Sequence, residues 1–271
     1  TPMGRVDRRG WAPRLPRRGV RRVERWIQTF FDYPIRVVHR LHFVGWERVP
    51  REVGPEGLII ASNHTAEADP VLLQTRVGAT IRWMMDRTQM TRAAAWLWRQ
   101  LQIIPVEFNR RDRSALQDGL AHLRSGGVLG VFPEGGIEEP PERLRPFQPG
   151  DGVLAARSGA PVLLVWMHGT PRVRGVLRSL FSRSRSVVHV VGLYRFTRDD
   201  GDGASASPER GATDPVVVRI EPRGIAEFLR QELAKVSGWP IEAEPLPHLL
   251  PAAANPERAA SSQAERPSPG D

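Results

Sequence analysis

Residues 63–70 read Asn-His-Thr-Ala-Glu-Ala-Asp-Pro, and they follow the apolar run Leu-Ile-Ile-Ala at residues 58–61. The apolar run predicts a short buried strand that ends where the polar stretch begins. Asp69 and Pro70 predict a helix start, with Asp69 as the N-cap and Pro70 as the first helical residue. We therefore expect His64 in a strand-to-helix loop, where the Asp69 carboxylate can reach its ring. On a regular helix, residues five apart would point about 140° away from each other.

His64 and Asp69 together have the chemistry of a general base and of the carboxylate that orients it. A neutral imidazole can take a proton from an alcohol as that alcohol attacks a carbonyl. A carboxylate on the other ring nitrogen fixes the tautomer and stabilises the imidazolium that forms. We expect one oxygen of Asp69 to serve the helix amides while the other accepts the imidazole N–H. Taken alone, the pair also fits an ordinary loop histidine beside a helix start.

The sequence favours direct attack by the acceptor over a covalent acyl-enzyme. No serine nucleophile is evident beside His64, and the chain has no cysteine. The acceptor alcohol would then be the nucleophile itself. A thioester donor suits this scheme, because a thiolate leaves without strong assistance from an acid.

A second polar block, Phe-Pro-Glu-Gly at residues 132–135, follows another apolar run. Residues 128–132 predict a buried strand with Glu134 at its end. Open α/β sheets place ligands at strand ends, which is where both blocks lie. Glu134 is also compatible with a simple turn residue. A helix is expected before this strand, with apolar residues at helical spacing between a cap and a glycine stop: Leu116, Leu120 and Leu123, after Ser114 and before Gly126-Gly127.

The two blocks, in this order, closely resemble the His-x4-Asp and Phe-Pro-Glu-Gly blocks of the glycerolipid acyltransferases, the family of 1-acylglycerol-3-phosphate O-acyltransferase. Residues 103–113 resemble the second block of that family, an apolar strand that leads to an arginine contacting the acceptor. Residues 159–165 resemble its fourth block, a proline-containing strand near the acyl pocket. Together with residues 42–47, the resemblance covers roughly residues 41–196.

The resemblance implies a single-domain α/β fold, with a mixed, mostly parallel sheet flanked by helices. It implies an enzyme that moves a fatty acyl group from acyl-CoA or acyl-carrier protein to a lipid hydroxyl, most directly that of 1-acylglycerol-3-phosphate in phospholipid biosynthesis. It implies no metal and no cofactor besides the acyl donor as co-substrate. Carried over residue by residue, it assigns catalysis to His64 and Asp69, acceptor binding to Glu134, Gly135, Arg110 and Arg111, and the acyl pocket to Pro161.

The chain departs from the family pattern at positions that concern the acceptor. The family usually continues its Glu-Gly with Thr-Arg-Ser, whereas residues 136–138 are Gly-Ile-Glu. The arginine that would help to hold a phosphate is therefore missing, and Gln148 stands where the family has a lysine. Arg143 or Arg145 could compensate. These losses leave the predicted acyl-transfer centre intact, and they argue against an acceptor that carries a phosphate.

Three alternatives follow. Within the same class, the acceptor could be another lysolipid, a glycolipid or an amino-acid lipid that lacks a phosphate monoester. The chain could instead be a catalytically silent lipid- or nucleic-acid-binding protein that uses its arginines, although the intact His64 and Asp69 argue against this. A hydrolase would use water in place of the alcohol.

Composition sets the outer bounds. With 271 residues and 40% hydrophobic content, the chain can bury a substantial single core. The formal charge is +9, and Lys235 is the only lysine among 39 basic residues, which excludes Gly-Lys phosphate loops. The absence of cysteine excludes disulfides and thiol catalysis. No nucleic-acid partner is expected for the preferred function.

We expect four regions along the chain. Residues 1–22 hold eight arginines against one aspartate and predict a disordered basic arm. Residues 23–40 predict an amphipathic helix, residues 41–250 the acyltransferase domain, and residues 251–271 a disordered tail. The apolar stripe of the helix, which ends near Pro34, consists of Val23, Trp26, Ile27, Phe30 and Phe31.

The basic arm and the stripe favour peripheral attachment to an anionic membrane surface. Arginines near an anionic surface attract lipid headgroups, and a basic helix with Trp and Phe can lie in the bilayer interface. The alternative is that the stripe packs on the core of the domain. No apolar run approaches the roughly 20 residues needed to span a bilayer. The expected location is the cytoplasmic face of a membrane.

Overall fold

The computed structural model describes residues 32–90, 98, 102–107, 113–139, 141–198 and 213–242. The strands are β1 (His42–Val44), β2 (Leu58–Ser62), β3 (Ile81–Asp86), β4 (Ile104–Val106), β5 (Val128–Val131), β6 (Val162–His168), β7 (Val187–Thr197) and β8 (Val216–Arg219). The helices are α2 (Asp69–Gln74), α4 (Arg113–Arg124), α5 (Pro149–Ser158), α6 (Val176–Phe181) and α7 (Ile225–Ser237), with short 3-10 turns at η1 (Trp46–Arg48) and η2 (Arg87–Gln89). Residues 32–38 are also helical.

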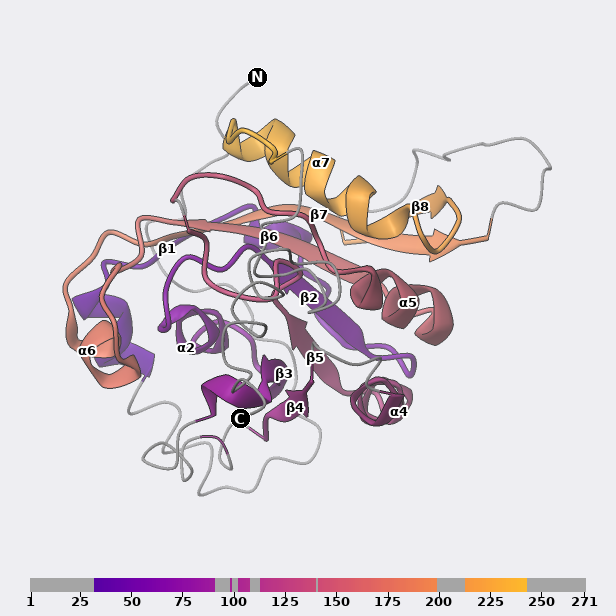
Figure 1. Cartoon of the computed structure of the whole chain (residues 1–271), viewed down its shortest axis with the longest axis horizontal. Helices are drawn as coiled ribbons and strands as arrows, with labels where there is room; N and C mark the ends of the chain where they lie inside the picture. The colour runs from indigo at the N-terminus through magenta and orange to yellow at the C-terminus, as the bar shows by residue number, and fades with distance from the viewer. Residues whose placement is uncertain are drawn as a thin grey trace, which may run out of the picture.

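The eight described strands form one sheet in the order β1-β7-β6-β2-β5-β3-β4, with β8 beside β7 (Figure 1). Of the strand pairs in this part of the chain, only β6 and β7 are antiparallel. The sheet is therefore mixed and mostly parallel, which confirms the predicted fold class.

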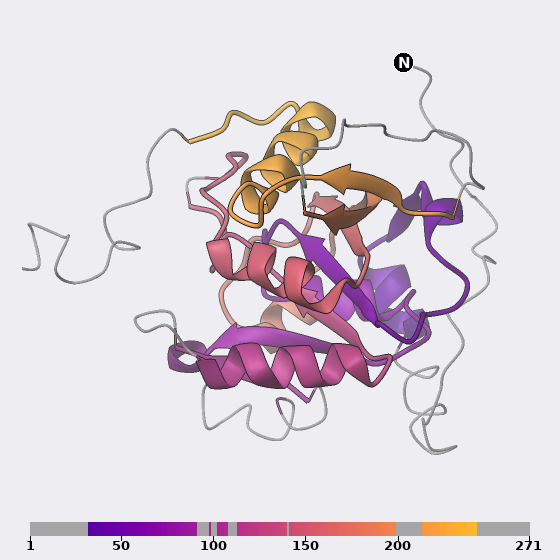
Figure 2. The ribbon, with the colours of Figure 1, turned by 90° about the vertical axis from the view of Figure 1, so that its right-hand side faces the viewer.

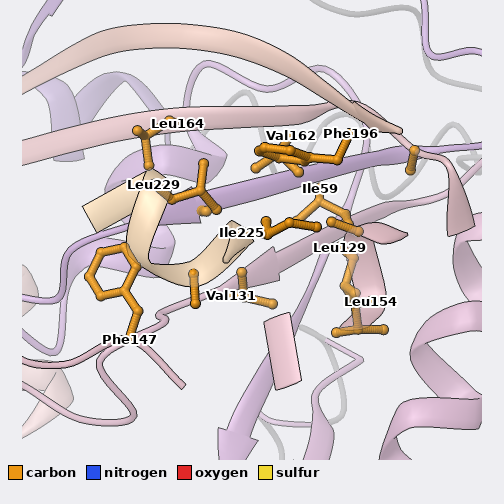
Figure 3. Packing of buried hydrophobic residues seen from close by; sticks show 14 of the residues in the cluster. Ile59, Leu129, Val131, Phe147, Leu154, Val162, Leu164, Phe196, Ile225 and Leu229 are labelled. Atoms are coloured by element: carbon orange, nitrogen blue, oxygen red, sulfur yellow. The ribbon is translucent and has the colours of Figure 1, made fainter. Parts of the chain in front are cut away.

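Helices cover both faces of this sheet. On the central strand β2, Ile59 and Ala61 point into a core shared with α4, α5 and α7. Leu58 and Ile60 alternate with them and enter a second core that contains the buried leucines of α2. Figure 2 shows α4, α5 and α7 on the same side of the sheet, and Figure 3 shows the packing of the first core. A strand buried on both faces is continuously apolar, as residues 58–61 of β2 are.

Several predicted boundaries need correction. Helix α2 begins at Asp69 with Ala68 as its N-cap, so Asp69 is the first helical residue and not the cap. Ser114 lies inside α4, which already includes Arg113. Residues 32–38 are helical and lie within the amphipathic helix predicted at residues 23–40, whose earlier part is outside the described residues.

Some predictions fall outside the described residues. These are the basic arm at residues 1–22, the stripe up to Phe31, the tail at residues 251–271, and Arg110 and Arg111. Within the described residues, no helix has both the length and the apolar character that crossing a membrane requires.

Candidate active site

Two polar loops meet at one edge of the sheet, because β2 and β5 are adjacent and parallel. Ala61 of β2 pairs with Val131 of β5, so the loops that follow the two strands emerge side by side. The first loop carries His64 and the second begins at Phe132. Their rings stack, with centroids 3.9 Å apart and an angle of 12° between the planes. The two sequence blocks are therefore parts of one site.

The stack continues into the core of the protein. Phe132 also lies flat on Trp83 of β3, with centroids 4.6 Å apart and an interplanar angle of 9°. Gly130 of β5 makes room for this arrangement, because a Cβ there would lie 2.5 Å from the Trp83 ring. A small residue at this position thus allows a buried tryptophan to support the ring beneath His64.

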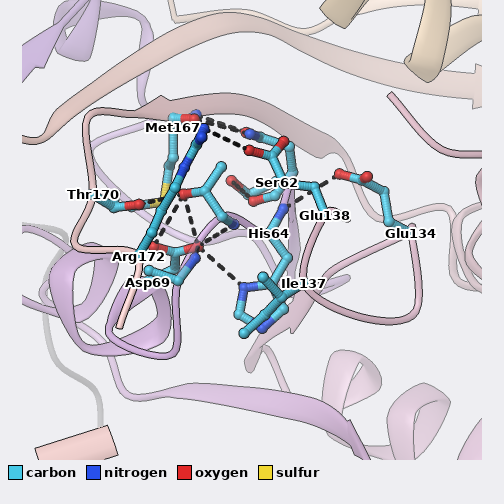
Figure 4. A network of polar contacts seen from close by, with 12 residues as sticks. Ser62, His64, Asp69, Glu134, Ile137, Glu138, Met167, Thr170 and Arg172 are labelled. Carbon is cyan, nitrogen blue, oxygen red and sulfur yellow. Dashed lines mark hydrogen bonds and ion pairs between the residues drawn. The ribbon is translucent and has the colours of Figure 1, made fainter. Parts of the chain in front are cut away.

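Asp69 holds His64 from the side of the loop. The Nδ1 atom of His64 lies 3.1 Å from Oδ2 of Asp69, whose side chain is fully buried (Figure 4). Since a carboxylate only accepts hydrogen bonds, Nδ1 carries the proton and Nε2 presents a lone pair. The ring itself is slightly exposed, at 12% of its side-chain surface. This is the geometry expected of a general base and its orienting carboxylate.

The same oxygen of Asp69 also organises the backbone of the loop. It accepts hydrogen bonds from the backbone N–H of Thr65 at 2.7 Å and of Ala66 at 2.8 Å. This corrects the prediction that one oxygen serves the helix amides and the other serves the imidazole. The donors lie in the loop and converge on Oδ2, because Asp69 is the first residue of α2 and its side chain turns back over the preceding turn.

Glu134 supports the loop from behind. Its Oε1 accepts from the backbone N–H of His64 at 3.3 Å, and its Oε2 accepts from the backbone N–H of Arg145 at 3.3 Å. The side chain is fully buried, and burial raises the pKa of Glu134 to about 8 against the opposing effect of the amide donors. The structure thus places Glu134 against the backbone of the loop, whereas the resemblance assigned it to the acceptor.

Asn63 is a loop-positioning residue that the sequence analysis did not single out. Its side-chain amide donates to the carbonyl of Met167 at 2.9 Å and accepts from the N–H of the same residue at 2.7 Å. These two hydrogen bonds extend the contact between β2 and β6, and they fix the position of Asn63, which directly precedes His64. The sequence could have indicated this role of Asn63, because Asn63 is a polar residue directly after a buried strand.

The segment that departs from the family pattern packs directly against the histidine loop. Gly135 adopts a left-handed conformation with φ 72°, which glycine allows at low cost. The N–H of Glu138 then donates to the carbonyl of His64 at 2.8 Å. The Glu138 carboxylate is almost fully buried and pairs with Arg172 at 3.1 Å. Burial raises the pKa of Glu138 to about 7, with Arg172 among the groups that oppose the shift.

The two arginines considered as replacements differ in their surroundings. Arg143 is exposed. Arg145 is buried, and its Nη1 donates to the carbonyl of Ile137 at 3.1 Å. A Cβ on Gly136 would lie 3.5 Å from the same nitrogen. Arg145 therefore supports the backbone of Ile137, the residue that stands where the family pattern has an arginine. The predicted acceptor residues Arg110 and Arg111 cannot be placed, since they lie outside the described residues.

A cavity of about 830 Å³ opens beside His64. This volume lies in the range of sites for small molecules. Part of its wall is apolar, formed by Val71, Met85, Trp98, Ile103, Val176 and Leu177. Charged side chains complete the lining, namely Glu67, Glu138, Glu139, Arg172, Arg174 and Arg178. The site can therefore hold an apolar chain and a polar group together next to the base.

Pro161 is not among the residues that line this cavity, and its contribution to an acyl pocket stays a prediction. Its carbonyl accepts from the N–H of Ile59, near the start of β2, whereas His64 follows the end of that strand. At about 3.3 Å per residue, the five residues of β2 separate the two positions by roughly 16 Å. Pro161 instead begins the pairing of β6 with β2.

No group of three or more His, Asp or Glu side chains in the described residues is arranged to hold a metal ion. The chemistry that these residues can perform is proton transfer by His64, with Asp69 stabilising the charge that forms on the ring.

Comparisons with known proteins agree with this geometry. Residues 40–168 match the model of the Acyltransferase family. The structure is similar to the crystal structure of the 1-acyl-sn-glycerophosphate (LPA) acyltransferase, PlsC, from Thermotoga maritima, with a TM-score of 0.52 and 19% sequence identity over 91% of this chain and 81% of that chain. At this identity the likeness concerns the fold alone. The comparison with curated proteins found no match.

Proposed function

We propose that this chain, whose residues 40–168 match the model of the Acyltransferase family, is a member of that family and moves a fatty acyl group from acyl-CoA or acyl-carrier protein to a lysolipid hydroxyl. The acceptor that the family resemblance favours is 1-acylglycerol-3-phosphate, in phospholipid biosynthesis. The observation that carries the proposal is the contact between His64 Nδ1 and Asp69 Oδ2 at the edge of a partly apolar cavity.

In the proposed reaction, His64 takes one proton and later returns it. Nε2 of His64 takes the proton of the acceptor hydroxyl as the oxygen attacks the thioester carbonyl. A tetrahedral intermediate forms and collapses, the C–S bond breaks, and the imidazolium returns its proton to the departing thiolate. Asp69 stabilises the imidazolium between these two steps. The products are an ester and a free thiol, and the protein forms no covalent bond.

The substrates suggest where this reaction takes place. The proposed donors dissolve in water, whereas a lysolipid resides in a bilayer. We therefore place the enzyme at the cytoplasmic face of a membrane, attached peripherally. The anionic surface of that membrane would be a partner, alongside the donor and the acceptor.

A second candidate keeps the reaction and changes the acceptor. Ile137 lines the cavity at the position of the family's phosphate-binding arginine, and the carboxylate of Glu138 is buried next to it. An apolar and an acidic side chain are poor partners for a phosphate dianion, because like charges repel. The observation favours a lysolipid, glycolipid or amino-acid lipid that lacks a phosphate monoester.

One experiment tests the proposal and separates the candidates. The protein is incubated with labelled acyl-CoA or acyl-carrier protein and a panel of lysolipids, and the products are resolved by mass spectrometry. We expect acyl transfer to at least one lysolipid, and its loss in His64→Ala. Free fatty acid released at the same rate with and without acceptor would indicate a hydrolase. A folded protein that binds lipid and releases neither product would indicate a silent binding protein.

A further inference from the structure

Two segments on one side of the molecule expose large apolar side chains. Tyr33 and Val37, from helical residues 32–38, are 75% and 56% exposed. Leu177 and Phe181, from α6, are 69% and 78% exposed. These four side chains, which we name the apolar rim, are four of the seven strongly exposed large hydrophobics in the described part of the chain. Such a concentration marks an interaction surface.

Hydrogen bonds hold the two segments of the rim together. The Nε2 atom of His39 lies 2.9 Å from the carbonyl of Leu180, and its Nδ1 lies 2.8 Å from the hydroxyl of Ser184. The N–H of Ser184 also donates to the carbonyl of Val38 at 3.4 Å. His39 is fully buried, and burial lowers the pKa of its ring. Figure 1 shows α6 beside the first described helix. The two segments that carry the apolar rim are therefore held side by side.

The surroundings of the rim are basic. Residues 171–186 contain five arginines and no acidic residue, and residues 32–41 contain two arginines and one acidic residue, the buried Asp32. Arg172 is paired with Glu138, but Arg174, Arg178, Arg183 and Arg185 are exposed. Exposed aromatic and aliphatic side chains among arginines match the interface of a bilayer that contains anionic lipids.

The rim also adjoins the mouth of the active-site cavity. Val176, Leu177 and Arg178 of α6 line the cavity that contains His64. A bilayer seated on the rim would therefore lie against the opening through which a lipid acceptor reaches the base.

We propose that the apolar rim, which joins the described end of the helix predicted at residues 23–40 to α6, is a docking surface for an anionic lipid bilayer. Tyr33, Val37, Leu177 and Phe181 enter the interfacial layer, and the neighbouring arginines contact headgroup phosphates. The test measures vesicle binding without any substrate, so its outcome is independent of the proposed acyl transfer.

The absence of cysteine allows a direct test on the full chain. Single variants Val37→Cys and Phe181→Cys receive an environment-sensitive fluorophore, one on each segment of the rim. Val216→Cys is the matched control, because Val216 is 52% exposed on β8, which Figure 1 shows far from α6. Each protein is mixed with phosphatidylcholine vesicles or with vesicles containing phosphatidylglycerol. Brominated lipid then reports contact with the acyl region.

We expect a blue shift and bromolipid quenching at positions 37 and 181 with anionic vesicles, and neither at position 216. Binding should weaken as salt rises, since exposed charges are screened over about 8–10 Å. At about 1 kcal/mol per arginine, Arg183→Ala and Arg185→Ala should each weaken binding about fivefold. Arg223→Ala, at an exposed arginine before α7, should leave binding unchanged.

Four results would overturn the proposal. The first is vesicle binding with the labels at 37 and 181 still in water, which would assign docking to residues 1–31. The second is labels already shielded in buffer and unchanged by lipid, which would show that this chain or a second copy covers the rim. The third is equal quenching at position 216, which would indicate nonspecific adsorption. The fourth is no binding to anionic vesicles.

Discussion

The ring of Phe132 lies flat on the ring of His64, with centroids 3.9 Å apart, although 68 positions separate the two residues in the chain. The contact brings the two sequence blocks together in one site. Asp69 fixes the direction of the imidazole through Nδ1, and Phe132 fixes the plane of the ring. A general base has to be held close to its productive geometry, so in the proposed mechanism Phe132 is a positioning residue.

We predict that Phe132→Leu lowers kcat about tenfold or more and changes KM little, because a branched aliphatic side chain cannot support the imidazole plane. Phe132→Tyr keeps the ring and should retain most activity. Steady-state kinetics and thermal unfolding of both variants test this. Equal kcat in wild type and a folded Phe132→Leu protein would contradict a positioning role.

Variants of His64 and Asp69 separate chemistry from loop structure. His64→Ala should lose roughly 10²–10⁴-fold in acyl transfer and remain folded. Asp69→Asn can still present one oxygen to the amides of Thr65 and Ala66, so we expect near-normal stability with a loss of at least roughly 10²-fold in activity. Asp69→Ala leaves those amides without their acceptor and should also lower the free energy of unfolding by about 1–3 kcal/mol for each buried donor.

Denaturant unfolding and single-turnover kinetics on the three variants give the comparison. Near-normal turnover in folded His64→Ala would remove the general base from the mechanism. Equal stability of Asp69→Asn and Asp69→Ala would contradict the role of Oδ2 as the acceptor for the loop amides.

Glu134 offers a direct choice between supporting the loop and binding the acceptor. Glu134→Gln retains one acceptor oxygen and turns an NH2 group toward one of the two backbone donors. If Glu134 supports the loop, kcat should fall and KM for the acceptor should stay constant. Binding of the acceptor by Glu134 would instead show as a higher KM at constant kcat. Initial rates over a series of acceptor concentrations distinguish the two outcomes.

Burial of Glu138 predicts a pH dependence of stability with a definite sign. Its pKa rises from the ordinary value to about 7, so the native state binds this proton more tightly than the unfolded state. The contribution of Glu138 to stability is therefore present below pH 4.5 and is lost as the pH rises through 7. Glu138→Gln does not titrate. The unfolding free energy of the variant relative to wild type should increase between pH 5 and pH 8.

Denaturant titrations at several pH values provide this difference, and groups common to both proteins cancel in it. The neighbouring Glu139 is exposed, so Glu139→Gln is a matched control for which the difference should stay flat. A difference for Glu138→Gln that stays flat or falls with pH would contradict the burial argument.

The sequence predicted the fold class and the contact between His64 and Asp69, because both depend on local patterns. Apolar runs followed by polar residues located β2 and β5, and the five-residue spacing placed His64 and Asp69 around a loop. The contacts of Asn63 and Phe132 were missed, because they join residues distant in the chain and depend on strand order. The place of Pro161 depends on strand order in the same way, since the parallel pairing of β6 with β2 puts it at the far end of the strand from His64.

The remaining prediction concerns the acceptor, which Ile137 brings into question. An arginine donates two hydrogen bonds to phosphate oxygens, and a charge-assisted hydrogen bond contributes roughly 1.5–3 kcal/mol. Ile137 lines the cavity, so Ile137→Arg restores a cation at the family's position. We expect this variant to increase the preference for lysophosphatidate over a lysolipid without a phosphate monoester by about 10- to 150-fold. Ile137→Gln, which is polar and uncharged, should not.

The comparison of kcat/KM for the two acceptors in wild type also tests the premise of this prediction. We expect a weak preference for lysophosphatidate, most of which Arg110→Ala removes. A strong preference that survives in Arg110→Ala and Arg111→Ala would show that another cation holds the phosphate. Arg143 is then the first residue to replace, because it is exposed, whereas Arg145 is buried and bonded to the carbonyl of Ile137. If Arg143→Ala abolished the preference without loss of stability, the acceptor would be lysophosphatidate and its phosphate would be bound on the loop before α5.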